Sequence, residues 1–163
     1  MASTSNSIER LPMINVAIIS NTASKELALL STPSDINAIA IEPANIATVD
    51  GQLVLFKPDI IVIEHSPAEG VSTDMLCFHL SKQFPKARNL ILSDTNPTYE
   101  MLQNSGFQSR GYITPDKRDQ IEKAIRVVID GEAWLPRKLV TEMLNRLSLS
   151  FVEIRDPFSI SEK

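Results

Sequence analysis

The stretch Pro58–Ser66, PDIIVIEHS, decides how the rest of the chain is interpreted. Apolar residues run unbroken from Ile60 to Ile63 and stop at Glu64. A short continuous apolar run between polar boundaries is typical of a strand that is buried on both faces of a parallel sheet. In open α/β sheets, functional sites lie beyond the carboxyl ends of the strands. We therefore expect the functional site of this protein around Glu64.

Four further apolar runs along the chain predict strands of the same kind. Together the strands are expected at 14–20, 36–41, 59–64, 89–93 and 111–114. Helices are expected between them at 23–30, 45–56, 72–83, 97–105 and 116–130, with one extra helix at 136–147. This alternation indicates a parallel sheet with helices on both faces. The expected class is α/β: a flavodoxin-like doubly wound five-stranded parallel sheet, order 2-1-3-4-5, with an additional C-terminal helix.

Local signals predict where several of these helices begin and end. Asn21 or Thr22 is expected to cap the first helix, because both side chains can accept a hydrogen bond from a free backbone N–H group. Asp94 to Pro97 is expected to cap the fourth helix, with proline in its first turn. Gly106 and Gly131 are expected to close the helices that precede them, since glycine readily adopts a left-handed conformation.

The composition excludes several classes of protein. The 163 residues, 43% apolar and 22% charged, support one globular domain with an appendage. The net charge of −4, without a basic block, predicts no nucleic-acid binding by this segment itself. The sequence has neither a signal peptide pattern nor an apolar run long enough for a membrane span. A single cysteine, Cys77, fits a reducing compartment, so we expect a cytoplasmic protein without membrane attachment.

The sequence also lacks the patterns of common cofactor sites. No glycine-rich phosphate-binding loop occurs, and two histidines with one cysteine cannot build a Cys/His zinc site. We therefore expect no metal, no resident cofactor, no catalytic residues and no enzymatic activity.

Four segments resemble the receiver domain of bacterial two-component response regulators. They are PDIIVIE (58–64), LILS (90–93), GYITPD (111–116) and AIRVVIDGEAWLPRKLVTEML (124–144). The last resembles the LuxR/NarL class, in which a helix-turn-helix DNA-binding domain follows the receiver. The closing DPFSISEK (156–163) resembles the start of that second domain. The resemblance implies a flexible arm (1–13), a receiver-like domain (14–131), an extra linker and dimerisation helix (132–148), and a linker (149–163) toward a missing DNA-binding domain.

In the phosphorylation pocket, the residues of this chain differ from those of working receivers. A working receiver holds Mg²⁺ with two acidic residues after strand 1, phosphorylates an aspartate after strand 3, and uses a lysine after strand 5. The corresponding positions here are Ser20 and Asn21 for the acidic pair, Glu64 for the acceptor, Ser93 after strand 4, Tyr112 as switch aromatic, and Pro115 for the lysine. Neutral side chains are poor Mg²⁺ ligands, and proline supplies no cation. The resemblance therefore implies a degenerate pocket without Mg²⁺, in which phosphorylation is not expected.

Two interpretations of Glu64 stay open at this point. Its carboxylate reaches one methylene further than that of aspartate, so it could imitate a phosphorylated acceptor. Alternatively, Glu64 is only a solvated strand end.

Trp134, Leu135, Pro136 and Arg137 form a candidate ligand site. A subset of LuxR-class regulators with degenerate receivers binds cyclic di-GMP through a Trp-[Phe/Leu/Met]-[Thr/Ser]-Arg motif at the same place. Trp134 and Arg137 would share one face of a helix and could contact guanine and phosphate. Pro136 departs from the motif, because it lacks the hydroxyl that would contact a phosphate. In the alternative interpretation, Trp134 only packs the extra helix on the domain, Pro136 starts that helix and Arg137 is a surface charge.

The main hypothesis is a regulatory receiver domain of a LuxR-class transcription regulator that acts through dimerisation without phosphorylation. The expected partners are a second copy of the chain and DNA, the latter through the missing domain. The candidate dimerisation residues are Leu139, Met143, Leu144 and Leu147. The alternative is a cyclic di-GMP sensor that dimerises through Trp134 and Arg137. A phospho-accepting receiver at Glu64 and a small flavodoxin-like enzyme rank below both.

Overall fold

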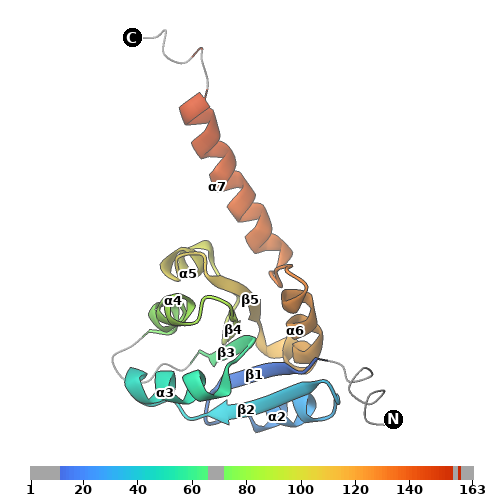
Figure 1. Cartoon of the computed structure of the whole chain (residues 1–163). Coiled ribbons are helices and arrows are strands. Elements are labelled where there is room, and N and C mark those ends of the chain that lie inside the picture. The colour runs from blue at the N-terminus through green and yellow to red at the C-terminus, as the bar shows by residue number, and fades with distance from the viewer. Residues whose placement is uncertain (1–11, 66–71, 156–157, 159–163) are drawn as a thin grey trace, which may run out of the picture.

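A computed structural model of the chain describes residues 12–65, 72–155 and 158. Within them, one parallel sheet has the order β2-β1-β3-β4-β5 (Figure 1). Its strands are β1 (Ile14–Ile19), β2 (Ile36–Ile41), β3 (Ile60–Glu64), β4 (Arg88–Leu92) and β5 (Ser109–Ile113). The predicted fold class and strand order are confirmed. The predicted arm up to residue 11, and the closing segment apart from residue 158, lie outside the described residues.

Helices cover both faces of the sheet. One face packs against α2 (Ser24–Ser31) and α6 (Ile121–Ile129), and the other against α3 (Ile46–Phe56), α4 (Thr73–Gln83) and α5 (Tyr99–Asn104). A 3₁₀ helix, η1 (Pro115–Gln120), leads from β5 into α6. The final helix, α7 (Arg137–Arg155), extends away from the domain (Figure 1).

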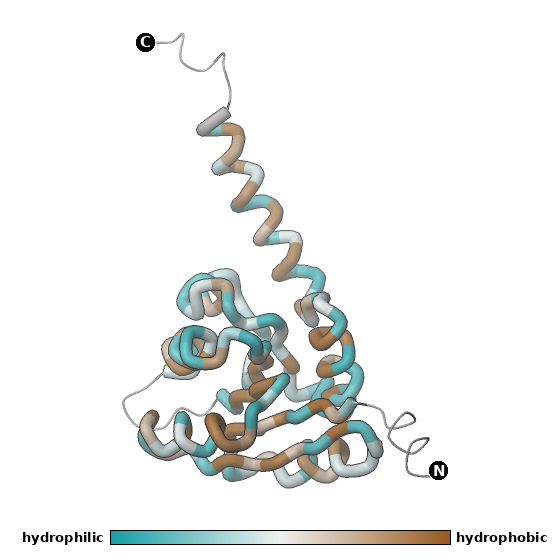
Figure 2. Tube along the Cα trace, viewed as in Figure 1, coloured by the Kyte–Doolittle hydropathy of each residue, from teal (hydrophilic) through white to brown (hydrophobic). Residues whose placement is uncertain are grey.

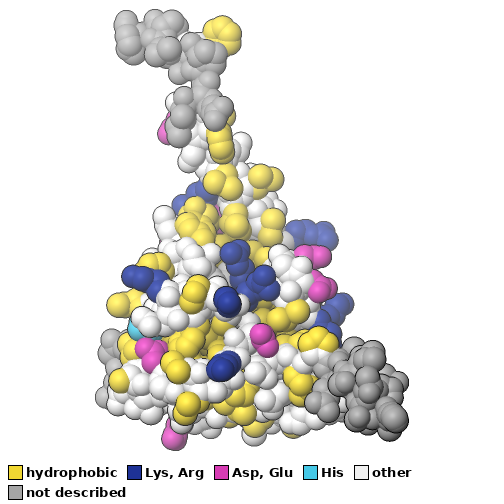
Figure 3. All heavy atoms as spheres, in the orientation of Figure 1, with side chains coloured by type: hydrophobic (Ala, Val, Ile, Leu, Met, Phe, Trp, Pro, Cys, Tyr) yellow, Lys and Arg dark blue, Asp and Glu magenta, His cyan; other side chains and the backbone are white. Residues whose placement is uncertain are grey.

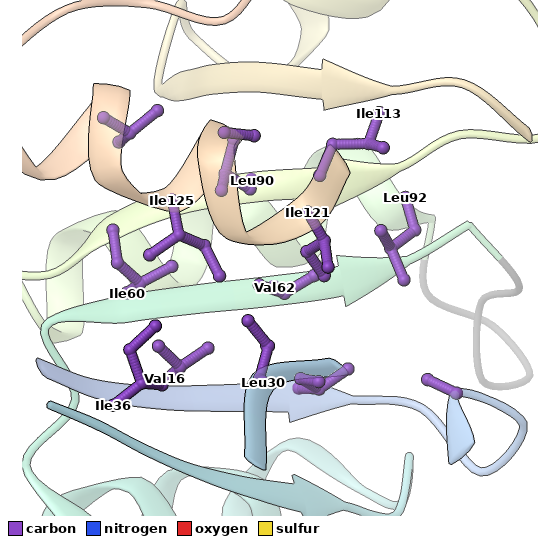
Figure 4. Packing of buried hydrophobic residues seen from close by; sticks show 14 residues of the cluster. Val16, Leu30, Ile36, Ile60, Val62, Leu90, Leu92, Ile113, Ile121 and Ile125 are labelled. Atoms are coloured by element: carbon purple, nitrogen blue, oxygen red, sulfur yellow. The ribbon is translucent and has the colours of Figure 1, made fainter. Parts of the chain in front are cut away.

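The core has two apolar clusters, one on each face of the sheet, because successive strand residues point to opposite faces. In β1, Val16 and Ile18 belong to the cluster beneath α2 and α6, whereas Ala17 and Ile19 belong to the other. Figure 4 shows the first cluster, and Figure 2 shows the hydrophobic strands at the centre of the domain. Burying each large apolar side chain contributes about 1.5–3 kcal/mol, so the buried residues of strands and helices both stabilise the domain.

The structure corrects two predicted helix caps. Ala23 is the N-cap of α2, and no side chain caps that helix. In α5, the hydroxyl of Thr98 accepts a hydrogen bond from the N–H of Met101, so Pro97 lies before the helix and not in its first turn. The predicted helix ends at Gly106 and Gly131 are confirmed, since their φ angles are 69° and 95°.

Two predicted helix ranges also change. The helix predicted at 116–130 is divided into η1 and α6. The final helix was predicted to end at 147, with a linker from 149, but α7 continues to Arg155. Its serines at 148 and 150 do not interrupt it, because serine is only mildly unfavourable within a helix.

Candidate functional site

The Glu64 side chain accepts hydrogen bonds from the loop that follows β1. Its Oε1 atom accepts from the hydroxyl of Ser20 and, at 2.7 Å, from the hydroxyl of Thr22. The backbone N–H of Thr22 in turn donates to the Ser20 oxygen at 2.9 Å. Ser20 is 3% exposed. Glu64 is therefore not a freely solvated strand end: its carboxylate is attached to the neighbouring loop.

This arrangement differs from the predicted set in one residue. Ser20 contacts Glu64 as its position suggested, but the second contact comes from Thr22 and not from Asn21, whose side chain is exposed. Thr22 had been considered only as a helix cap. The signal that could have identified it is the spacing Ser-x-Thr directly after a buried strand, which places two hydroxyls on the same side of the loop.

The other strand ends contribute local hydrogen bonds. The Ser93 hydroxyl donates to the carbonyl of Thr95 and accepts from its N–H at 3.3 Å. After β5, the Thr114 hydroxyl donates to Oδ1 of Asp116 at 2.7 Å, and this hydrogen bond lowers the pKa of the Asp116 carboxyl. The structure thus places Ser93 directly after β4, the strand beside β5, and gives its hydroxyl a partner within its own loop.

A cation that the sequence analysis missed lies at this edge of the sheet. Pro115 leaves the lysine position without a charge, but η1 turns the chain so that Arg118 reaches back to β4. Its guanidinium donates to the carbonyl of Ser93 at 3.3 Å and pairs with Glu26 of α2 at 3.5 Å. Asp94 lies 3.9 Å away. An arginine three residues after a helix-starting proline was the available signal, since one helical turn brings such residues together.

Tyr112, predicted as the switch aromatic, lies inside the domain. The residue is 1% exposed, and its hydroxyl lies close to the side chains of Ser109 and Ser105. Burial raises the pKa of this phenol. The ring belongs to the apolar cluster beneath α4 and α5, so Tyr112 is part of the core in this structure.

Trp134 pairs with β5 instead of entering the final helix. Its N–H donates to the carbonyl of Arg110 at 2.9 Å, and its carbonyl accepts from the N–H of Tyr112 at 3.0 Å. The close approach requires Gly111, because a Cβ atom there would lie 2.8 Å from the Trp134 carbonyl oxygen. The prediction that Trp134 and Arg137 share a helix face is wrong, since α7 begins only at Arg137.

The candidate ligand residues nevertheless line one pocket of about 590 Å³. Its lining residues are Asn96, Tyr112, Thr114, Asp116, Lys117, Trp134, Leu135, Pro136, Arg137 and Val140. Lys117 and Arg137 are exposed, and neither forms an ion pair within the part of the chain that the structure describes. The pocket therefore combines two unpaired cations with an aromatic ring.

The candidate dimerisation residues divide into two groups. Leu139 is 2% exposed and belongs to the core, and Met143 packs against the same cluster. These two residues attach α7 to its own domain, so they are not available to a partner as predicted. Leu144 and Leu147 are 66% and 53% exposed. On the attached side, Arg146 stacks over Tyr99 at 4.5 Å and pairs with Glu100 of α5 at 3.4 Å.

Within the described ranges, no group of three or more His, Cys, Asp or Glu side chains could hold a metal ion. No helix in the same ranges has the length and apolar character required to cross a membrane.

The chain is similar in sequence to the oxygen regulatory protein NreC of staphylococci. Identity is 31% over 115 residues to the Staphylococcus haemolyticus protein, covering 66% of this chain and 52% of that protein. Identity to the Staphylococcus aureus protein is 26% over 143 residues, which cover 83% of this chain and 64% of that protein. The chain thus spans about half to two thirds of the length of these relatives. No protein-family model matches it.

Solved receiver structures have the same fold. The non-phosphorylated receiver domain of RcsB from Escherichia coli superposes with a TM-score of 0.65 at 15% identity, covering 77% of this chain and 99% of that one. The chain folds as a response-regulator receiver domain. A LuxR-family response regulator from Aurantimonas gives a TM-score of 0.66 at 15% identity, with coverage of 85% and 99%. The receiver domain of NarL from Mycobacterium tuberculosis gives a TM-score of 0.62 at 16% identity, covering 75% of this chain and 100% of that one. All three solved structures are response regulators or their receiver domains.

Proposed function

We propose that this receiver domain belongs to a LuxR-class transcription regulator of the cytoplasm, works without phosphorylation, and acts through self-association. A DNA-binding domain would follow the chain and contact the target DNA. The hydrogen bonding of the Glu64 carboxylate supports phosphorylation independence. Its carboxylate accepts two hydroxyl hydrogen bonds from Ser20 and Thr22, the loop in which a working receiver places acidic Mg²⁺ ligands.

Three physical reasons connect this geometry with the proposal. Phosphoryl transfer needs a metal to neutralise developing charge, and hydroxyl groups are weak Mg²⁺ ligands beside carboxylates. One of the two Glu64 carboxylate oxygens, Oε1, is already hydrogen-bonded to both hydroxyls. Arg118, the cation at this edge, is bound to Glu26 and to the Ser93 carbonyl. The Glu64 side chain is thus attached to the β1 loop, which is compatible with a fixed signalling state.

Incubation with acetyl phosphate and Mg²⁺, followed by intact-mass spectrometry, tests this proposal. We expect no added phosphoryl mass, under conditions in which a receiver with the acidic pair, aspartate and lysine becomes modified. The Glu64→Gln variant is the matched control, because its amide oxygen can still accept both hydroxyl hydrogen bonds. A phosphoryl adduct on the wild-type chain that is absent from Glu64→Gln would overturn the proposal.

A second candidate function is a sensor for cyclic di-GMP. The pocket beside Trp134 supports it, because an aromatic ring and the unpaired cations Lys117 and Arg137 suit a ligand with planar bases and phosphates. The Asn96 amide adds a hydrogen-bond donor to the lining, which compensates in part for the missing hydroxyl at Pro136. The Thr114 hydroxyl already donates to Asp116, whose carboxylate also lines the pocket.

Calorimetric titration with cyclic di-GMP tests the second candidate. We expect micromolar binding that Arg137→Ala weakens at least tenfold. Lys138→Ala is the matched control, because it removes a neighbouring charge of α7 that does not line the pocket. Equal binding by both variants, or no heat with the wild-type chain, would contradict this function.

A further inference from the structure

Four exposed apolar side chains of α7 follow a heptad pattern, whereas Leu149 and Val152, which are also exposed, lie outside it. Val140, Leu144, Leu147 and Phe151 follow one another at intervals of four, three and four residues. They are 47%, 66%, 53% and 55% exposed. Alternating steps of three and four place side chains along one stripe of a helix, which is the arrangement that pairs two helices in a coiled coil. We refer to these four residues as the α7 seam.

We infer that the α7 seam pairs with the same seam of a second copy of this chain, in a parallel two-helix contact. This inference rests on the self-association proposed above and names the surface that performs it. It replaces the predicted set, because Leu139 and Met143 are turned toward the domain. At 100° per residue, the centre of the α7 seam lies about 110° around the helix from Leu139 and about 70° from Met143. One helix can therefore contact its domain and a partner at the same time.

The residues that flank the α7 seam favour a second copy as the partner. In a parallel pair, the flanking positions of one helix face those of the other, and like charges there would repel. Between 140 and 151 these positions hold Thr141, Met143, Ser148 and Ser150, and none is charged. The charged residues Glu142 and Arg146 lie elsewhere on the helix and pair with each other at 3.1 Å. Nothing on this surface opposes pairing with itself.

The placement of the domain favours the parallel direction. α7 has 19 residues and is thus about 28 Å long, and the domain packs around its first turns through Leu139, Met143 and Arg146. Antiparallel pairing would bring the last turns of one helix against the domain attached to the other. Parallel pairing keeps both domains at one end. Figure 1 shows α7 projecting from the domain, and Figure 3 shows hydrophobic side chains along it.

The chain offers a close control for testing this surface. Leu149 is 66% exposed, as Leu144 is, and lies on the same helix. At 100° per residue it is about 170° around the helix from the centre of the seam. Leu144→Lys and Leu149→Lys therefore make the same chemical change at equal exposure, and only the first lies on the proposed contact.

Light scattering of the full chain measures the outcome. We expect a wild-type mass twice the 18.1 kDa of one chain, the same mass for Leu149→Lys, and a single-chain mass for Leu144→Lys. If the wild type has the mass of two chains and both variants keep that mass, the α7 seam is not the contact, while the proposed self-association stands. If the wild type has the mass of one chain, both the self-association and the α7 contact are contradicted. A mass of four chains would contradict a two-helix contact.

Disulfide trapping of the Val140→Cys variant tests whether the two α7 helices run parallel or antiparallel. In a parallel pair the two cysteines lie opposite each other, within the Cα separation of about 4–7 Å that a disulfide requires. In an antiparallel pair centred on Leu147 they lie roughly 20 Å apart. Rapid formation of a linked dimer under mild oxidation is expected. Trapping no faster than for Lys138→Cys would overturn the parallel arrangement.

Discussion

Replacing Leu139 by alanine tests whether this residue belongs to the core or to a contact between chains. The side chain is 2% exposed and lies in the apolar cluster beneath α4 and α5. Leu→Ala removes about three carbon atoms, and each contributes roughly 0.8 kcal/mol when buried. The transfer contribution is therefore about 2.4 kcal/mol. The residual cavity adds to it, so we expect a loss of about 2–4 kcal/mol in the free energy of unfolding.

The control for Leu139→Ala is Leu144→Ala, one helical turn further along. Leu144 is 66% exposed in the single chain, so its truncation should cost less than about 0.5 kcal/mol. For a protein of this size, the Leu139 variant should melt roughly 5–10 °C lower, and the Leu144 variant within about 2 °C of wild type.

Urea unfolding followed by tryptophan fluorescence gives the two free energies. Trp134 is the single tryptophan of the chain and pairs with β5 just before α7, so its emission reports on the attachment of that helix. Association raises apparent stability with protein concentration, so the comparison is made where the mass is that of one chain. A Leu139→Ala loss below about 0.5 kcal/mol, or equal losses in both variants, would refute the assignment of Leu139 to the core.

Three further predictions follow from buried or close contacts. Cys77 is fully buried, and burial raises the pKa of its thiol to about 12, so a thiol reagent at pH 8 should modify the native chain far more slowly than the urea-unfolded chain; equal rates would contradict this burial. Hydrogen bonding to Arg126 at 2.8 and 2.9 Å lowers the pKa of Asp35 below 3.8. The stability that this ion pair adds is present above pH 3.8 and is lost as the pH falls through the lowered pKa of Asp35. The Asp35→Asn variant should therefore melt at a lower temperature than the wild type at pH 7, and the two melting temperatures should approach each other in acid. A difference in melting temperature that stays constant from pH 7 to pH 2 would exclude this linkage. Gly111→Ala would place Cβ 2.8 Å from the Trp134 carbonyl oxygen and 2.6 Å from Leu90. It should therefore lower the free energy of unfolding by about 1–3 kcal/mol and shift the fluorescence emission of Trp134. An unchanged spectrum together with wild-type stability would count against the pairing of Trp134 with β5.

Strand positions could be predicted from the sequence because buried parallel strands have a strong local signal. The run Ile60 to Ile63 has no polar side chain, and both of its faces are covered by helices. The predicted strand 36–41 agrees with β2, and the other strands differ by one or two residues at their ends. Alternation with helices then left few possible topologies, because parallel crossovers are right-handed.

The candidate site was predictable only in part, because its contacts join residues far apart in the chain. Glu64 was expected at the edge of the sheet, but its bond to Thr22 depends on how the β1 loop folds over it. Arg118 lies at this edge of the sheet only because η1 brings it back to the end of β4. No local pattern specifies which of several nearby polar side chains will lie within 3 Å of a given carboxylate.

The α/β class and the neutral residues after β1 could be predicted from the sequence, because they depend on residue type and on local periodicity, and the order of the sheet followed from the right-handedness of parallel crossovers. The face of α7 that packs against its own domain could be found only from the three-dimensional fold. Leu139 and Leu144 are the same residue type on one helix, yet the first is 2% and the second 66% exposed. The difference arises because α5 and the Tyr112 cluster lie against one side of α7, and burial depends on that neighbour and not on the side chain itself.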